Sequence, residues 1–247
     1  MSAIMHSNQT ISVLGGFAAE IPAADNPPSA PLSAVIFDLD GTLLNTLDDL
    51  ADATNHALRH NGLPERTIDE VRHFVGNGVR RLIEQAVPDD IDLVCLEQVF
   101  ADFKRYYVAH CQDKTCLYPG ITEMLNELKS RGYRMAIVSN KLQAGVDELY
   151  DRYFRDTVEV AVGERPGIAR KPAPDMVNAA LSALGIDSFE AIYVGDSDVD
   201  LLTARNSGLP CISVLWGFRD RQFLLAHGAT TLAETPTDVL RILNNKI

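Results

Sequence analysis

The pattern of apolar and polar positions divides most of the chain into short strands that alternate with longer amphipathic helices. Six apolar runs predict strands over 35–38, 134–139, 158–162, 191–195, 211–214 and 230–232. Between them, apolar residues at helical spacing predict helices over 46–61, 121–131, 142–151, 174–184 and 199–206. Strands that are apolar throughout and separated by helices form parallel sheets covered on both faces. The pattern therefore predicts an α/β protein built on a parallel sheet.

The stretch from about 64 to 112 follows a different pattern and contains no convincing buried strand. It is expected to form successive amphipathic helices over 68–74, 79–87 and 93–107. We therefore predict a helical insert over 47–116 that separates two parts of the core, 32–46 and 117–247. The chain crosses between them near 43–46 and 115–119, and we expect these crossings to act as hinges.

The N-terminal residues 1–31 have a composition unlike the rest of the chain. Alanine and proline dominate residues 18–31, which predicts a flexible leader outside the fold. A short apolar run at 11–17 has no basic residue before it, and no apolar span reaches 18 residues. We therefore expect neither a secretory signal nor a membrane segment.

Charge and cysteine content narrow the class of protein further. The formal net charge is −12, which argues against a nucleic-acid-binding surface because phosphate backbones are bound by basic patches. The 4 cysteines form no CxxC pair, so neither a zinc site nor a disulfide scaffold is expected. Reduced thiols are consistent with a cytoplasmic location. An acidic protein that acts on an anion needs a metal ion, a lysine or backbone amides at its site.

Two carboxylates, Asp38 and Asp40, stand where the first strand runs into Gly41. Because a strand repeats every two residues, both side chains can project to the same side of the chain end. Their repulsion is tolerable if a divalent cation or a cationic side chain lies between them. It becomes useful if one carboxylate attacks a substrate while the other transfers a proton.

Polar groups also follow three other predicted strands. They are Ser139, Asn140 and Lys141 after the second strand, Lys171 in the loop after the third, and Asp196, Ser197, Asp198 and Asp200 after the fourth. Each alone has an ordinary interpretation as a helix cap, a turn or a solvated charge. Ligands of open parallel sheets bind beyond the carboxyl ends of the strands, so their joint occurrence at one edge indicates a functional site.

These four groups, in this order, resemble the motifs of the haloacid dehalogenase-like superfamily, most of whose members are magnesium-dependent phosphatases. The residues that carry the resemblance are Asp38-Leu39-Asp40-Gly41-Thr42, Val138-Ser139-Asn140, Lys171-Pro172 and Val194-Gly195-Asp196-Ser197 with Asp200. Within the superfamily, Phe74-Val75-Gly76-Asn77-Gly78, Tyr118-Pro119-Gly120 and Tyr193-Val194-Gly195-Asp196-Ser197 resemble phosphoglycolate phosphatase-like proteins. The resemblance implies a three-layer, Rossmann-like core with an inserted helical C1 cap.

The resemblance also implies a role for each motif residue. Asp38 is expected to be the nucleophile that forms an aspartyl-phosphate, and Asp40 the group that donates and then accepts a proton. Ser139 and the amide of Asn140 would bind the phosphoryl oxygens, and Lys171 would neutralise charge on the nucleophile and the phosphoryl group. Thr42 and Asp200 would contact these residues and orient them without touching the substrate themselves. In the cap, Gly76, Asn77 and Gly78 would meet the far end of the substrate.

The expected cofactor is Mg2+, which prefers hard oxygen ligands. Its predicted ligands are the Asp38 carboxylate, the Asp40 main-chain carbonyl and the Asp196 carboxylate. The expected partner is a small phosphorylated metabolite, and 2-phosphoglycolate is the favoured substrate. The protein itself is expected to be a monomer or a homodimer. Two alternatives stay open: another activity of the superfamily (pyrophosphatase, nucleotidase, sugar-phosphate phosphatase or phosphomutase), or a non-catalytic binding subunit.

Overall fold

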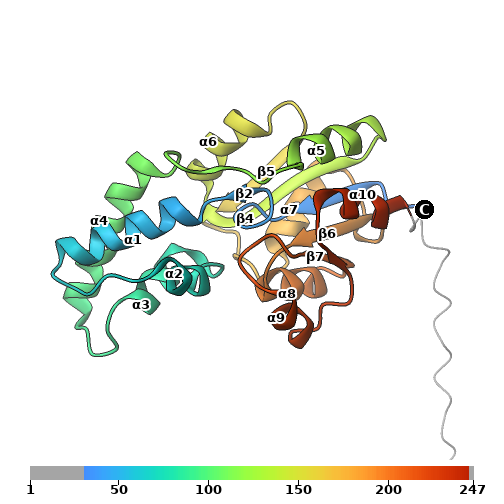
Figure 1. Cartoon of the computed structure of the whole chain (residues 1–247). Coiled ribbons are helices and arrows are strands. Elements are labelled where there is room, and N and C mark those ends of the chain that lie inside the picture. The colour runs from blue at the N-terminus through green and yellow to red at the C-terminus, as the bar shows by residue number, and fades with distance from the viewer. Residues whose placement is uncertain (1–30, 245–247) are drawn as a thin grey trace, which may run out of the picture.

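A six-stranded parallel sheet forms the centre of the molecule in the computed structural model, which describes residues 31–244 (Figure 1). The strand order is β5-β4-β1-β6-β7-β8. The strands are β1 (Ala34–Phe37), β4 (Arg134–Leu142), β5 (Val160–Glu164), β6 (Ala191–Gly195), β7 (Cys211–Val214) and β8 (Leu232–Ala233). The predicted α/β fold with a parallel sheet is confirmed. The predicted leader over 1–31 lies outside the described residues except for its last position.

Both faces of the sheet are buried, and alternate residues of β1 show how. Val35 and Phe37 pack into one hydrophobic cluster with α5 (Ile121–Ser130), α6 (Gln143–Tyr153) and α10 (Pro236–Asn244). Ile36, between them, packs into a second cluster with α7 (Asp175–Leu184) and α8 (Asp198–Asn206). Successive side chains of a strand point to opposite faces, so an uninterrupted apolar run supplies both layers. The result is a three-layer α/β/α core.

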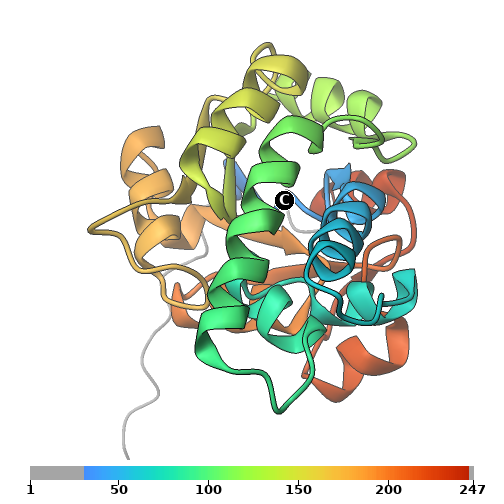
Figure 2. The same cartoon turned by 90° about the vertical axis from the view of Figure 1, so that its left-hand side faces the viewer.

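Four helices lie together beyond one end of the sheet and share a hydrophobic cluster of their own. They are α1 (Leu47–His60), α2 (Ile68–Phe74), α3 (Gly78–Ala86) and α4 (Leu93–His110), and we call them the helical insert. Figure 2 shows α1 and α4 in front of the sheet. Phe103 of α4 is completely buried in this cluster. Among the described residues, no helix has the length and apolar character needed to cross a bilayer.

The two chain crossings between the core and the helical insert lie side by side. They pair as the antiparallel strands β2 (Leu44–Asn45) and β3 (Cys116–Leu117), which the sequence did not predict because each is only 2 residues long. Asp49 in the first turn of α1 accepts hydrogen bonds from the amides of Lys114 and Thr115. A side chain of the helical insert therefore holds the second crossing against the first.

The remaining predicted elements agree with the observed bounds to within 3 residues. Two C-terminal helices were missed, α9 (Arg221–Ala226) and α10. The sequence does contain a signal for α10, because Thr235, Pro236 and Asp238 are residue types typical of a helix start. In the structure Pro236 occupies the first helical position, and Thr235 and Asp238 exchange capping hydrogen bonds. The short 3-10 turn η1 (Ser188–Glu190) was also missed.

Candidate active site

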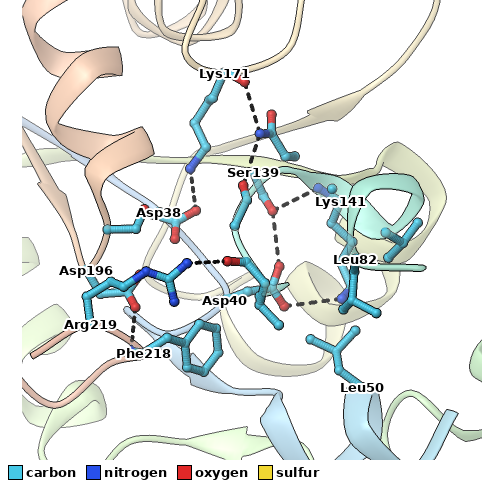
Figure 3. A pocket seen from close by; sticks show the side chains of 16 residues that line it. Asp38, Asp40, Leu50, Leu82, Ser139, Lys141, Lys171, Asp196, Phe218 and Arg219 are labelled. Carbon is cyan, nitrogen blue, oxygen red and sulfur yellow. Dashed lines mark hydrogen bonds and ion pairs between the residues drawn. The ribbon is translucent and has the colours of Figure 1, made fainter. Parts of the chain in front are cut away.

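The polar groups at the carboxyl ends of β1, β4 and β6 and in the loop after β5 converge on one pocket between the sheet and the helical insert. Figure 3 shows Asp38, Asp40, Ser139, Lys171 and Asp196 on its wall. These residues are separated by up to 158 positions in the sequence. They meet because parallel strands bring their carboxyl ends to the same edge of the sheet.

Asp38 stands at the carboxyl end of β1 and is almost fully buried. Its amide donates to the carbonyl of Val194 in the neighbouring strand over 2.9 Å, which holds its backbone in the sheet. Its Oδ1 accepts a hydrogen bond from Lys171 Nζ over 2.6 Å. Burial and the nearby Asp200 carboxylate raise the pKa of Asp38 well above its ordinary value, although Lys171 acts in the opposite direction.

Lys171 is the centre of a buried charge network. Its ammonium donates to Asp38 over 2.6 Å, to Asp200 over 2.8 Å and to the hydroxyl of Tyr193 over 3.1 Å. Burial by itself would lower the pKa of Lys171, but the Asp200 and Asp38 carboxylates outweigh it and raise the pKa. Lys171 therefore stays charged beside Asp38.

Asp200 supports this network from the first turn of α8. Its Oδ1 accepts from Lys171 and Tyr193, and its Oδ2 accepts from the amide and hydroxyl of Ser197. A Cβ on Gly195 would lie 2.4 Å from the Asp200 side chain. Glycine at position 195 therefore lets Asp200 pack directly against the end of β6.

Asp196 presents a buried oxygen that lacks a partner within the described part of the chain. Its Oδ2 accepts from the amide of Phe218 over 2.6 Å, whereas its Oδ1 is buried without a hydrogen-bond partner among residues 31–244. Burial and the Asp200 carboxylate raise the pKa of Asp196 to about 7. A buried carboxylate oxygen with no donor is costly, and a cation at that oxygen removes the cost.

The residues present fit a divalent cation. Oxygen atoms of Asp38, Asp196 and Asp200 lie within 4.8 Å of one another, and all three side chains are buried. Glycines form the cradle around this group: a Cβ on Gly41 would lie 2.5 Å from Asp196, and one on Gly217 would lie 2.3 Å from it. Buried carboxylates in such proximity are the hard ligands that divalent cations prefer. Asp200 already accepts four hydrogen bonds, so Asp38 and Asp196 are better placed as ligands.

Asp40 is less buried than Asp38 and makes separate contacts. Its carboxylate accepts from Ser139 Oγ over 3.3 Å and from Lys141 Nζ over 3.2 Å. Gly41 directly after it has a φ of +92°, a conformation that favours glycine and turns the chain back toward Leu44. The two carboxylates therefore have different cationic partners, Lys171 for Asp38 and Lys141 for Asp40.

The other predicted site residues have different positions in the pocket. Asn140 donates from its side chain to the carbonyls of Lys171 and Gly76, and so links the core to the helical insert. Thr42 is buried behind the site, and its carbonyl accepts from Trp216 Nε1 over 2.9 Å. Gly76 and Gly78 line the pocket, whereas Asn77 between them is exposed and is not part of its wall.

Two cationic side chains on the wall, Lys141 and Arg219, were given no function by the sequence prediction, although Lys141 was among the polar groups predicted at the sheet edge. Lys141 follows Asn140 in β4 and also donates to the hydroxyl of Tyr107 in α4 over 2.6 Å. Arg219 follows β7 and donates to the carbonyls of Arg72, His73 and Val75 at the end of α2. Local sequence contains no signal for these partners, since each contact joins the core to the helical insert.

Comparisons with known proteins agree with this geometry. Residues 35–214 match the family model of haloacid dehalogenase-like hydrolases. The chain is 31% identical over 221 residues to the phosphoglycolate phosphatase of Aquifex aeolicus, covering 87% of this chain and 99% of that protein. It is 35% identical over 192 residues to the phosphoglycolate phosphatase of Caulobacter vibrioides, covering 76% of this chain and 81% of that protein.

A solved structure has the same fold. It comes from Lactobacillus delbrueckii subsp. bulgaricus and is named as a candidate phosphoglycolate phosphatase. The TM-score is 0.83 at 34% sequence identity, and the match covers 87% of this chain and 99% of that one.

Proposed function

Because the chain belongs to the haloacid dehalogenase-like hydrolase family, we propose that it is a magnesium-dependent phosphatase whose substrate is 2-phosphoglycolate. The products would be glycolate and inorganic phosphate, released through an aspartyl-phosphate intermediate. The observation that carries the proposal is Asp38: its carboxylate is 2.6 Å from a buried lysine and shares a pocket with Asp196, whose buried Oδ1 has no hydrogen-bond partner in the part of the chain that the structure describes. The names of the relatives support the substrate.

The first step transfers the phosphoryl group to the protein. An oxygen of Asp38 forms a bond to phosphorus as the bond to the leaving alkoxide breaks, and Asp40 gives that alkoxide a proton. Lys171, whose ammonium contacts Asp38, neutralises charge on the phosphoryl group. Ser139 and the amide of Asn140 hold the phosphoryl oxygens.

The second step releases phosphate. Asp40 accepts a proton from water, the water oxygen bonds to phosphorus, and the bond from phosphorus to Asp38 breaks. Mg2+ would be held by the carboxylates of Asp38 and Asp196 and the main-chain carbonyl of Asp40, and when bound it supplies charge stabilisation for the transferring group.

The helical insert would act as a cap that excludes bulk water during the transfer. Its residues Gly76 and Gly78 lie on the pocket wall, and Gly78 begins α3. Their backbone amides would meet the end of the substrate distant from phosphorus. The paired crossings β2 and β3 are the expected hinges. Asn77 is left out of this contact because it is exposed.

The test compares phosphate release by the wild type, Asp38→Asn and Asp198→Asn. The panel contains 2-phosphoglycolate, a nucleotide, a sugar phosphate and pyrophosphate, each with Mg2+ or with EDTA. Asp198→Asn is the matched control, since Asp198 lies on the same sheet edge but not on the pocket wall. We expect turnover that requires Mg2+, a loss of at least about 10³-fold in Asp38→Asn, and little change in the control.

Acid-quenched wild type should also carry radiolabel from labelled substrate, and Asp38→Asn should not. Turnover by Asp38→Asn within tenfold of the wild-type value would refute the assignment of Asp38 as the nucleophile. Equal turnover of the whole panel would refute the proposed substrate.

A further inference from the structure

The two lysines on the pocket wall differ in how many of their N–H groups are already used. An ammonium group has three donors. Lys171 uses all three, on Asp38, Tyr193 and Asp200. Lys141 has two partners among residues 31–244, Asp40 and Tyr107. One N–H of Lys141 is therefore left for a ligand.

Lys141 is held in place at the pocket and does not extend into solvent. Its side chain is 7% exposed, although a lysine head normally remains in water. The hydroxyl of Tyr107 accepts from its Nζ over 2.6 Å, and the Tyr107 ring centroid lies 4.9 Å from the same nitrogen. Tyr107 belongs to α4, so the ammonium is fixed between the core and the helical insert.

The position of Lys141 relative to Asp40 defines which part of a substrate it reaches. Under the proposed function, Asp40 gives a proton to the leaving oxygen, so that oxygen lies at hydrogen-bond distance from the Asp40 carboxylate. Lys141 Nζ lies 3.2 Å from the same carboxylate (Figure 3). A group carried on the carbon next to the leaving oxygen therefore comes within reach of the ammonium.

The remaining cation on the wall, Arg219, has other partners. Its terminal nitrogens donate to three carbonyls of the helical insert, those of Arg72, His73 and Val75, and its Nε lies 3.9 Å from Asp198. The chain as a whole has a formal charge of −12, which repels an anionic leaving group unless a local cation receives it. Of the described cations on the wall, Lys141 is the one in contact with Asp40, and it is therefore the one beside the leaving oxygen.

We propose that Lys141 is a specificity-determining residue that binds a carboxylate on the leaving alcohol. The substrate class is then the phosphate monoesters of small 2-hydroxycarboxylates. This inference rests on the proposed function and deepens it. Tyr107 is a positioning residue, because its hydroxyl orients the ammonium.

The experiment compares two esters of similar size, 2-phosphoglycolate and 2-hydroxyethyl phosphate, which differ in whether the alcohol carries a carboxylate or a neutral hydroxymethyl group. The readout is the ratio of their kcat/KM values. Both values are expected to fall in any variant of Lys141, since Lys141 also contacts Asp40. The ratio isolates the contact to the carboxylate.

Three variants probe the charge. Lys141→Met removes it at similar length and should lower the ratio by about 10- to 100-fold, as expected for one charge-assisted hydrogen bond. Lys141→Arg keeps the charge and should retain most of the preference. The matched control is Lys104→Met, on the exposed side of α4, which should leave the ratio at the wild-type value.

A binding measurement covers the case in which Lys141→Met is inactive. Calorimetric titration of both esters into Asp38→Asn and into Asp38→Asn/Lys141→Met gives the same ratio from Kd values. We expect the double variant to lose at least about tenfold in preference for 2-phosphoglycolate. Tyr107→Phe should produce a smaller loss of preference.

The outcomes separate this inference from the proposed function. Hydrolysis of both esters without preference, or an equal loss for both in Lys141→Met, overturns the role of Lys141 and leaves the phosphatase standing. Hydrolysis of neither ester by the wild type overturns the proposed function and this inference with it.

Discussion

Removal of divalent cations should make the stability of the folded protein fall as pH rises, because of Asp196. Its pKa is raised to about 7 in the fold, whereas an unfolded aspartate has a pKa of about 3.9. The folded state therefore binds the proton more tightly than the unfolded state does. Stability is lost as pH rises from the unfolded value through the folded value.

The magnitude follows from the difference between these two pKa values. Full ionisation of Asp196 in the metal-free fold costs about 4 kcal/mol at 1.36 kcal/mol for each pKa unit, and most of this, about 3 kcal/mol, is lost between roughly pH 5 and pH 8. Saturating Mg2+ should remove most of the loss, since a bound cation stabilises the ionised carboxylates.

The assay is urea unfolding in EDTA, followed by the fluorescence of Trp216. This is the single tryptophan of the chain, and it donates to the carbonyl of Thr42 beneath the site. Asp196→Asn is the control, because it removes the titrating group and keeps an oxygen for the Phe218 amide. The free energy of unfolding of the wild type should fall by about 3 kcal/mol more than that of the variant between about pH 5 and pH 8. Parallel pH dependences of the two proteins in EDTA would refute the reasoning.

Three further predictions test the surroundings of the site. Gly217→Ala should weaken Mg2+ binding at least about tenfold in calorimetry, since its Cβ would lie 2.3 Å from Asp196. Gly145→Ala, where the nearest contact is 3.5 Å, should leave the affinity unchanged. Equal affinities in the two variants would contradict the role of glycine at position 217 in making room for Asp196. Arg219→Met leaves carbonyls at the end of α2 without donors and should lower the free energy of unfolding in urea by about 2 kcal/mol; an unchanged midpoint would show that water replaces the guanidinium. Phe103→Ala opens a cavity in the helical insert and should cost about 3–5 kcal/mol in thermal unfolding, and a cost below about 1 kcal/mol would contradict the packing of that cluster.

The sequence by itself determined which segments become strands and helices of the core. An uninterrupted apolar run such as Ala34–Phe37 can only be buried on both faces, and the amphipathic stretches between such runs must cover those faces. It also marked candidate chemistry, since carboxylates such as Asp38 and Asp40 at the end of an apolar strand are rarely needed for structure alone. These features are local, and local patterns follow from residue type and spacing.

The tertiary structure alone decided which groups become partners. Lys171 contacts Asp38 and Lys141 contacts Asp40, across 133 and 101 positions. The family resemblance implies the first contact, but neither can be derived from spacing along the chain. The link from Arg219 to the end of α2 and the pairing of β2 with β3 likewise join distant segments. Such contacts depend on the order of strands in the sheet and on where the helical insert comes to rest. Those are properties of the whole packed chain, in which burial of many side chains together sets each distance.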